Sequence, residues 1–527
     1  MKTNPSSVPA HVPPAFWTKF GHHVSHVLAG FDRLRFRGTL RLLFEPKAME
    51  VYLQVCHVLI KDFARFAESL TQRVKAAAYA AAEAARRPAQ YLPSADLSKE
   101  DLAREIARRD RIQSGLVVLF TAVEPCYSYS VRGDRQRKEI HLALELRKCT
   151  HLYHYYLHPD FGLCHVRVQT WFPFTVEVCL NGREWLARQM DRAGLRYTQR
   201  DNCFLRVSDP QQAQQLLESQ LATDWCDVLN DLLNQAHPLH EEIGRPLRQR
   251  YYWTATQTEY ATDLVFASPD ALTPLYRPFV HHGIRSFGCK DLLRFLGYRK
   301  PGRFSGQVTS TLKHRVEGLR LRHGINGNSI KVYDKQGQIL RVETTINHPE
   351  HFKVYRQPEN QPEASLSWRK LRRGVADLRR RAQISDAANT RYLEALASVT
   401  GQTPLHQACA RACRSITHDG RRYRPLNPLG PEDGQLLEIL SLGELTLHGF
   451  RNRDLRQRLY PGRPTPQEDR RHAARLTRLL ALLRAHGLVK KVPHTHRYHL
   501  TTQGRLIVTA LLAARQASVD QLTQLAA

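Results

Sequence analysis

The sequence predicts an α+β protein in which a β-sheet core lies between a helical N-terminal part and a helix-rich C-terminal module. Three observations support this prediction. Of the 527 residues, 42% are apolar and 24% are charged, a balance typical of a folded chain with several domains. Apolar and polar residues alternate through the middle of the chain, which indicates strands. Near the C-terminus, apolar residues recur at helical spacing between capping residues, which indicates helices.

The charge of the chain predicts its class of partner. Lys and Arg number 78 against 49 Asp and Glu, which leaves a net charge of +29 and a pI of about 10.0. A folded chain this basic typically binds a polyanion, because basic side chains release counterions from phosphates. An Arg-rich composition or a ribosome-associated role is the alternative. A mean hydropathy of −0.47, with no apolar run of about 18 residues, argues against an integral membrane protein.

The ten cysteines include no CxxC pair, and the first 14 residues lack the apolar stretch of a secretory signal. We therefore expect a cytoplasmic protein with mostly buried, reduced thiols. Composition and Pro/Gly content predict five parts: a flexible arm (1–14), a basic helical N-terminal region (15–115), an α+β core (116–356), a basic helical linker region (357–427) and a C-terminal domain (428–527).

The N-terminal region opens with a predicted strand in the stretch 31–44. Leu34 and Phe36 alternate there with three arginines, which gives the strand one basic face suited to nucleic acid: Arg33, Arg35 and Arg37. A long helix is predicted from about 48 to 87. Another is predicted from Lys99 to Arg109, with Ser98 as its N-cap.

The core alternates strands with helices. Strands are predicted at 116–123, 139–146, 148–157, 163–180 and 203–207, and helices at 183–193 and 210–221. This β-β-α-β-α order favours a ferredoxin-like or RRM-like sheet with one helix-covered face. Helices are then expected within 224–250 and 269–296, and a second β region at 302–347. A basic helix at 368–381 would present further nucleic-acid contacts: Arg369, Arg372 and Arg373.

In the C-terminal domain, Thr465 and Glu468 form a capping box for a helix running to Ala485. Its leucines lie on one side, and four arginines lie on the other: Arg470, Arg471, Arg475 and Arg478. Two strands follow, at 488–492 and 497–500. The segment resembles the recognition helix and wing of the winged-helix family. That resemblance implies a helix in the DNA major groove, with phosphates held by the wing, whereas protein contacts are the alternative use of the fold. The implied wing residues are Lys490, Lys491 and Arg497.

A His- and Tyr-rich hairpin turns at 159–162. If His158 pairs with Leu163, one face of the hairpin carries His154, Tyr156, His158, His165, Arg167 and Gln169. Such a face could bind nucleic acid through His154, Tyr156 and Arg167, or a divalent metal through His154 and His165. It could be a nuclease centre, or its histidines could simply be hydrogen-bonded. Rolling-circle replication initiators carry a similar His-hydrophobic-His strand, although here Arg167 stands where their second His lies.

A second hairpin turns at the loop 335–337. Its pattern places Val332 against Leu340 and Ile330 against Val342, facing inward. The outward positions are Ser329, Lys331, Tyr333, Arg341 and Glu343. The hairpin is similar to a segment of plasmid and phage replication initiators. The resemblance implies Tyr333 as nucleophile, Glu343 as a metal ligand or base, and Lys331 or Lys335 as a phosphate clamp. His165 of the first hairpin is a further catalytic candidate. Alternatively, Glu343 pairs with Lys331 or Arg341 for structure alone.

The whole chain is similar to an uncharacterised bacterial family found in many genomic copies, which implies a mobile-element protein. We therefore expect a nucleic-acid-binding protein that processes DNA, as a nicking enzyme, an endonuclease or a replication or transposition initiator. The alternative is a non-catalytic binder of DNA or structured RNA, or a transcriptional regulator. DNA is the expected partner, RNA the alternative, and a divalent metal (Mg or Mn) the expected cofactor.

Overall fold

A computed structural model describes residues 8–93, 97–134, 136, 138–298, 306–315, 318–358, 361, 363–399, 409–442, 445, 449–462, 464–493 and 495–519. The chain is 44% helix and 32% strand and contains a large mixed sheet, which confirms a mixed helix-and-strand fold. Within these residues, no helix is both long and apolar enough to cross a membrane. Half of the predicted N-terminal arm, residues 1–7 of 1–14, lies outside the described residues.

The chain forms two compact units. The central unit comprises Leu28–Ala261 and Thr345–Ser385, and the terminal unit comprises Met1–Val27, Thr262–Thr344 and Asp386–Ala527. The chain passes between the units within four elements: β1 (Val24–Thr39), β9 (Tyr252–Phe266), β13 (Ile339–Ile346) and α11 (Leu378–Leu396).

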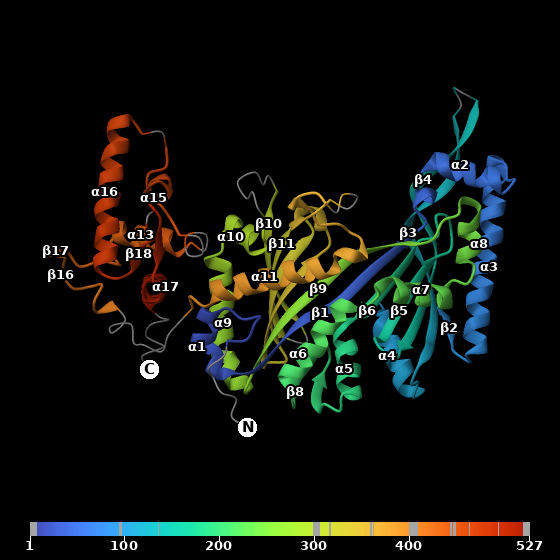
Figure 1. Cartoon of the computed structure of the whole chain (residues 1–527), viewed down its shortest axis with the longest axis horizontal. Coiled ribbons are helices and arrows are strands. Elements are labelled where there is room, and N and C mark those ends of the chain that lie inside the picture. The colour runs from blue at the N-terminus through green and yellow to red at the C-terminus, as the bar shows by residue number, and fades with distance from the viewer. Residues whose placement is uncertain are drawn as a thin grey trace. The chain divides into compact units, whose positions relative to one another are not determined.

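The central unit is built on a sheet with strand order β9-β1-β6-β5-β4-β3-β2. Strands β3 to β6 follow one another as antiparallel neighbours, and β2 joins β3 in parallel. Strands β3 and β4 pair along almost their whole length, and the far end of this hairpin projects beyond helix α2 (Pro46–Val55; Figure 1). The other strands are β2 (Ala89–Tyr91), β3 (Gly115–Asp134), β4 (Glu139–His158), β5 (Gly162–Gln169) and β6 (Val176–Asn181).

Several helices cover one face of this sheet, and a single helix, α4, packs on the other face. Leu34 and Phe36 of β1 and Val166 of β5 are fully buried in one core with residues of the helices α2, α3, α5, α6 and α7. Helix α4 packs on the opposite face, where Ala103 and Ile106 meet strand β3. The remaining helices of the unit are α3 (Phe63–Ala84), α4 (Lys99–Arg109), α5 (Gly182–Arg192), α6 (Pro210–Ser219), α7 (Trp225–Ala236) and α8 (His240–Gly244).

Several of these helices begin at the capping residues that the sequence predicts. Helix α4 has the expected bounds, and the Ser98 hydroxyl accepts a hydrogen bond from the Asp101 amide at 3.2 Å. The predicted helix over 48–87 is wrong in one respect, because it is two helices. His57 adopts a left-handed backbone with φ 56°, which ends α2 before α3 begins.

The predicted β-β-α-β-α segment does not form one sheet. Strand β8 (Cys203–Val207) pairs with β7 (Tyr197–Arg200) in a separate two-stranded sheet. The strand expected at 163–180 is interrupted between β5 and β6. Alternation along the chain identified the strands, whereas their partners depend on contacts distant in sequence.

The predicted basic helix at 368–381 is wrong over most of its length. Residues Ser367–Lys370 form strand β15, which pairs with β14 (Lys353–Arg356). The buried Asp377 carboxylate then accepts a hydrogen bond from the Arg372 amide at 2.9 Å, and α11 begins only at Leu378.

The terminal unit contains strands in the order β10-β11-β12-β13-β9: β10 (Val308–Arg315), β11 (Gly318–Ile325), β12 (Asn328–Lys335) and β13. Its helices near this sheet in sequence are α1 (Pro14–Phe20), α9 (Pro269–Arg285) and α10 (Cys289–Phe295). Its C-terminal part comprises α13 (Pro431–Ser441), α15 (Asn452–Leu459), α16 (Pro466–Ala485), α17 (Thr502–Gln516), the hairpin β18 (Val489–Lys491) and β19 (Tyr498–Leu500), and the small hairpin β16 (Ile416–His418) and β17 (Arg421–Tyr423).

Candidate functional site

The register of the His–Tyr hairpin differs by one residue from the predicted one. His158 pairs with Gly162, so Tyr155 lies opposite His165 and Tyr153 lies opposite Arg167. The loop therefore has three residues instead of four, and Gly162 closes it with φ 59°. A one-residue shift exchanges the two faces of a strand.

This shift moves two predicted binding residues into the core. His154 now lies opposite Val166 and, like Tyr156, is buried on the helix-covered side. Burial lowers the pKa of His154 to about 4, so its imidazole is neutral at physiological pH. His154 and His165 therefore lie on opposite faces of the sheet and do not form the predicted pair of metal ligands.

The opposite face, here called the polar face, is continuous across five strands. The pairings align Arg35 with Cys179, Cys179 with His165 and His165 with Tyr155. The neighbouring row aligns Arg37, Glu177, Arg167 and Tyr153. The polar face consists of Arg33, Arg35 and Arg37 of β1, Glu177 and Cys179 of β6, His165, Arg167 and Gln169 of β5, Cys149, His151, Tyr153 and Tyr155 of β4, and Glu124 and Cys126 of β3.

Carboxylates neutralise much of the positive charge on the polar face. Glu177 binds Arg37 at 2.6 Å and Arg167 at 2.9 Å. Burial alone would raise the pKa of Glu177, but the two guanidinium groups lower it. Arg33 lies 3.7 Å from a carboxylate oxygen of Glu100. Three of the predicted phosphate-binding arginines therefore have acidic partners within the protein.

A small cavity of about 270 Å³ opens on the polar face beside the start of α4. Arg35, Lys99 and Arg167 contribute positive charge to its lining, and Tyr153, Tyr155 and His165 contribute rings. Burial lowers the pKa of His165 to about 4, helped by the charge of Arg35, which leaves the imidazole neutral. The cavity is smaller than typical cofactor sites of roughly 300–1,000 Å³.

Glu124 connects this cavity to a second cluster. The Tyr153 hydroxyl donates to the Glu124 carboxylate at 2.7 Å, and the Lys99 ammonium lies 3.3 Å from it. Burial opposes ionisation of Glu124, but the Tyr153 hydrogen bond and the charges of Arg167 and Lys99 lower its pKa. Glu124 pairs directly with Cys149 across the β3–β4 ladder.

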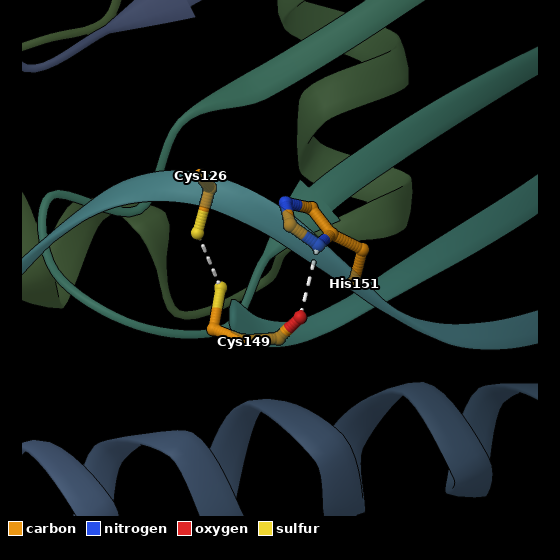
Figure 2. Close-up of side chains that lie close together, drawn as sticks. All are labelled: Cys126, Cys149 and His151. Atoms are coloured by element: carbon orange, nitrogen blue, oxygen red, sulfur yellow. Dashed lines mark hydrogen bonds between the residues drawn. The ribbon is translucent and has the colours of Figure 1, made fainter. Parts of the chain in front are cut away.

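The second cluster joins two thiols and an imidazole: Cys126, Cys149 and His151 (Figure 2). The sulfur atoms of Cys126 and Cys149 lie 2.8 Å apart. A hydrogen bond from the Cys149 thiol, together with nearby His151, lowers the pKa of the Cys126 thiol to about 5 and raises that of Cys149. None of these three residues is among the site residues predicted from the sequence. Cys149 and His151 stand two apart on one strand, but only the β3–β4 register brings Cys126 to them.

The residues proposed for catalysis on the second hairpin are buried instead of outward-facing. The Lys331 ammonium donates to the Glu343 carboxylate at 2.5 Å, which is the structural pairing considered as an alternative. Tyr333 is only 7% exposed, and burial raises the pKa of its hydroxyl to about 12. A phenol with a raised pKa is a poor nucleophile, so the arrangement does not favour Tyr333 as an attacking group.

Arg341 of the same hairpin makes a second buried ion pair. Its guanidinium Nε and Nη2 donate to the Asp263 carboxylate at 2.5 and 2.8 Å, with side-chain exposures of 1% and 3%. Both members lie within the terminal unit. Nearly all residues of β12 and β13 are buried. The charged side chains Lys331, Glu343 and Arg341 of this hairpin therefore pair with one another or with β9 and do not face solvent.

The basic segment at 369–381 is also partly neutralised. Arg372 and Arg380 pair with Asp377 at 3.4 and 2.8 Å, and Arg373 pairs with Glu350 at 3.1 Å. Arg369 is exposed on strand β15. The arginines of the one predicted helix are therefore distributed over strand β15 (Arg369), the segment that follows it (Arg372 and Arg373) and the start of α11 (Arg380).

The C-terminal helix α16 has the predicted polarity. Leu476, Leu480 and Leu483 are buried, whereas the four arginines on the other side are exposed: Arg470, Arg471, Arg475 and Arg478. The capping box is present, since the Glu468 carboxylate accepts from the Thr465 amide at 2.8 Å. Among these arginines, Arg475 contacts Glu432 at 2.5 Å.

The hairpin after α16 carries the predicted basic strand residues. Lys490 and Lys491 of β18 are exposed, and Arg497 is half-buried, with its guanidinium donating to the Gly449 carbonyl at 3.2 Å. Phe450 forms an isolated antiparallel β-bridge with Tyr498 beside this hairpin. Comparisons with models of known protein families, with curated proteins and with solved structures found no match to this chain.

Proposed function

We propose that the protein binds duplex DNA through its C-terminal module, which acts as a winged helix. The observation that carries this proposal is the exposed arginine row of α16, opposite a fully buried leucine stripe. The elements of this module follow one another in the order typical of a winged helix: α13, the bridge at Phe450, α15, α16 and the hairpin β18–β19. Helix α16 is the element that would enter the major groove.

The proposal assigns two kinds of contact. Arg470, Arg471 and Arg478 would meet phosphates or base edges along α16, and Lys490 and Lys491 would meet phosphates from the hairpin. Duplex DNA is favoured over RNA because the major groove of an A-form RNA helix is too narrow for a helix. Binding without strand cleavage is favoured because Tyr333 is buried and Glu343 is paired with Lys331.

Salt-dependent binding of a labelled DNA duplex by the full chain tests this function. Replacing Arg470, Arg471 and Arg478 with Gln should weaken binding and reduce the slope of log K against log salt by about 3, if each arginine neutralises one phosphate. Arg475 is left intact because it contacts Glu432.

The matched control replaces three exposed arginines of the central unit with Gln: Arg108, Arg200 and Arg206. This control changes the net charge by the same amount but should leave the slope unchanged. Equal slopes for the two triple variants would refute the assignment of α16. Cleavage of the duplex by the wild-type protein with Mg²⁺ or Mn²⁺ would refute the non-catalytic form of the proposal.

A further inference from the structure

The polar face carries a thiol–imidazole cluster where the β3–β4 hairpin leaves the sheet. Pairing between β4 and β5 ends at His151 and Gln169, so β4 continues beyond His151 with β3 as its strand partner. Cys149 lies two residues beyond His151, and Cys126 is its diagonal neighbour on β3. Alternation along the strands therefore places all three side chains on one face.

The geometry of the cluster suits a shared ligand. One donor atom from each of Cys126, Cys149 and His151 lies within 4.8 Å of the other two. The His151 ring nitrogen Nδ1 is 3.2 Å from the Cys149 carbonyl oxygen, to which it can donate. Its other nitrogen, Nε2, is directed toward the Cys126 side of the cluster (Figure 2). A hydrogen bond from one ring nitrogen to a backbone carbonyl is typical of histidines that bind a metal through the other.

Arg167 supports the same tautomer. Its guanidinium Nη2 lies 3.2 Å from His151 Nε2, and a guanidinium can only donate, so Nε2 presents a lone pair. A metal ion would take over this lone pair. Arg167 would then lose its hydrogen bond to His151 but keep its ion pair with Glu177 at 2.9 Å, so the charge of Arg167 would stay balanced.

We propose that Cys126, Cys149 and His151 bind one zinc ion, with water as the fourth ligand. Two thiolates and an imidazole form a soft donor set that suits zinc, whereas magnesium and manganese prefer oxygen ligands. Two thiolates on a tetrahedral zinc lie about 3.8 Å apart, given zinc–sulfur bonds of about 2.3 Å. Zinc binding therefore moves the sulfur atoms about 1 Å further apart than their present 2.8 Å separation.

The zinc ion would fasten β3 to β4 at the base of the projecting hairpin. Beyond this point the hairpin exposes large side chains, among them Tyr127 at 61% and Leu146 at 65%. A disulfide is the competing use of the two thiols. A disulfide would use only the two sulfur atoms, whereas a zinc ion would also use the imidazole of His151. The zinc site does not depend on the proposed DNA binding.

Metal analysis of the full chain, purified without chelator from zinc-supplemented cells, tests the site. The expected content is one zinc per chain, falling to near zero in Cys126→Ser and Cys149→Ser and substantially in His151→Gln. Cys179→Ser is the matched control, because Cys179 is a half-buried thiol of the same polar face outside the cluster. It should retain the zinc.

Cobalt provides a readout that does not depend on whether the variants fold. Wild-type protein stripped of zinc and loaded with Co²⁺ should show thiolate-to-cobalt charge-transfer absorption, with the visible bands of tetrahedral coordination. Absence of that absorption, or equal zinc contents in Cys126→Ser and Cys179→Ser, overturns the proposal. A Cys126–Cys149 disulfide in protein that binds no zinc once reduced also overturns it, in favour of a redox pair.

Discussion

The buried ion pair between Arg341 and Asp263 leads to a specific prediction for the free energy of unfolding of the terminal unit. Replacing Asp263 with Asn keeps the size of the side chain and removes its charge. The Arg341 guanidinium, which is 1% exposed, then loses its charged contacts with Asp263. The expected result is a large loss of stability of the terminal unit.

The magnitude follows from the two hydrogen bonds and the burial. Hydrogen bonds to charged groups contribute about 1.5–3 kcal/mol each, and breaking a buried ion pair from one side typically costs about 3–5 kcal/mol. We therefore expect about 3–4 kcal/mol for Asp263→Asn, since the amide oxygen still accepts one bond. In a folded unit of about 150–250 residues, this corresponds to a melting temperature about 10 °C lower.

Thermal unfolding followed by circular dichroism measures this change. Glu432→Gln is the control in the same unit, because the Arg475–Glu432 pair is exposed and solvent screening leaves it little effect on stability. The double variant Asp263→Leu, Arg341→Met should unfold at a higher temperature than Asp263→Asn, since it removes both charges of the pair. A shift for Asp263→Asn no larger than that of Glu432→Gln would refute the reasoning.

Three further predictions concern acid stability, register and capping. The unfolded chain takes up a proton near pH 6.5 at His154, whereas burial lowers the pKa in the folded state to about 4. Stability is therefore fully present above pH 6.5 and falls by up to about 1.4 kcal/mol per pH unit toward pH 4. Urea unfolding at pH 7 and pH 5 should show a smaller difference for His154→Gln than for the wild type, and an equal difference would contradict this. Leu152→Ala should cost about 2–5 kcal/mol in urea unfolding, because the observed register buries Leu152 in the core; a loss under about 1 kcal/mol would support the predicted register instead. Thr465→Ala removes the hydroxyl that caps α16 and should destabilise the C-terminal module by about 1 kcal/mol, measured by the helical signal on heating, with Thr495→Ala expected to change little.

The helix ends were predictable because their determinants are local. The hydroxyl of Ser98 and the Thr465–Glu468 pair act across three residues, so the sequence contains the whole interaction. The polarity of α16 was predictable for a similar reason, since helical spacing alone puts its leucines and arginines on opposite sides.

The candidate sites were not predictable to the same degree. One loop conformation, with Gly162 at positive φ, decided whether His154 or Tyr153 joined Arg167. Cys126 reached Cys149 and His151 only through a pairing across 23 residues of chain. Period-two alternation identifies the two faces of a strand but does not say which face of the next strand it meets.

The sequence by itself thus determined the mixed helix-and-strand composition, the capped helices, the basic character and the arginine row of α16. Only the tertiary structure decided that Lys331, Tyr333, Arg341 and Glu343 are buried, and that Glu177 neutralises Arg37 and Arg167. The physical reason is the separation along the chain over which each interaction acts. Capping and helical spacing act within one or two turns, whereas the charge and burial of a strand residue depend on the neighbouring strands and on what covers each face.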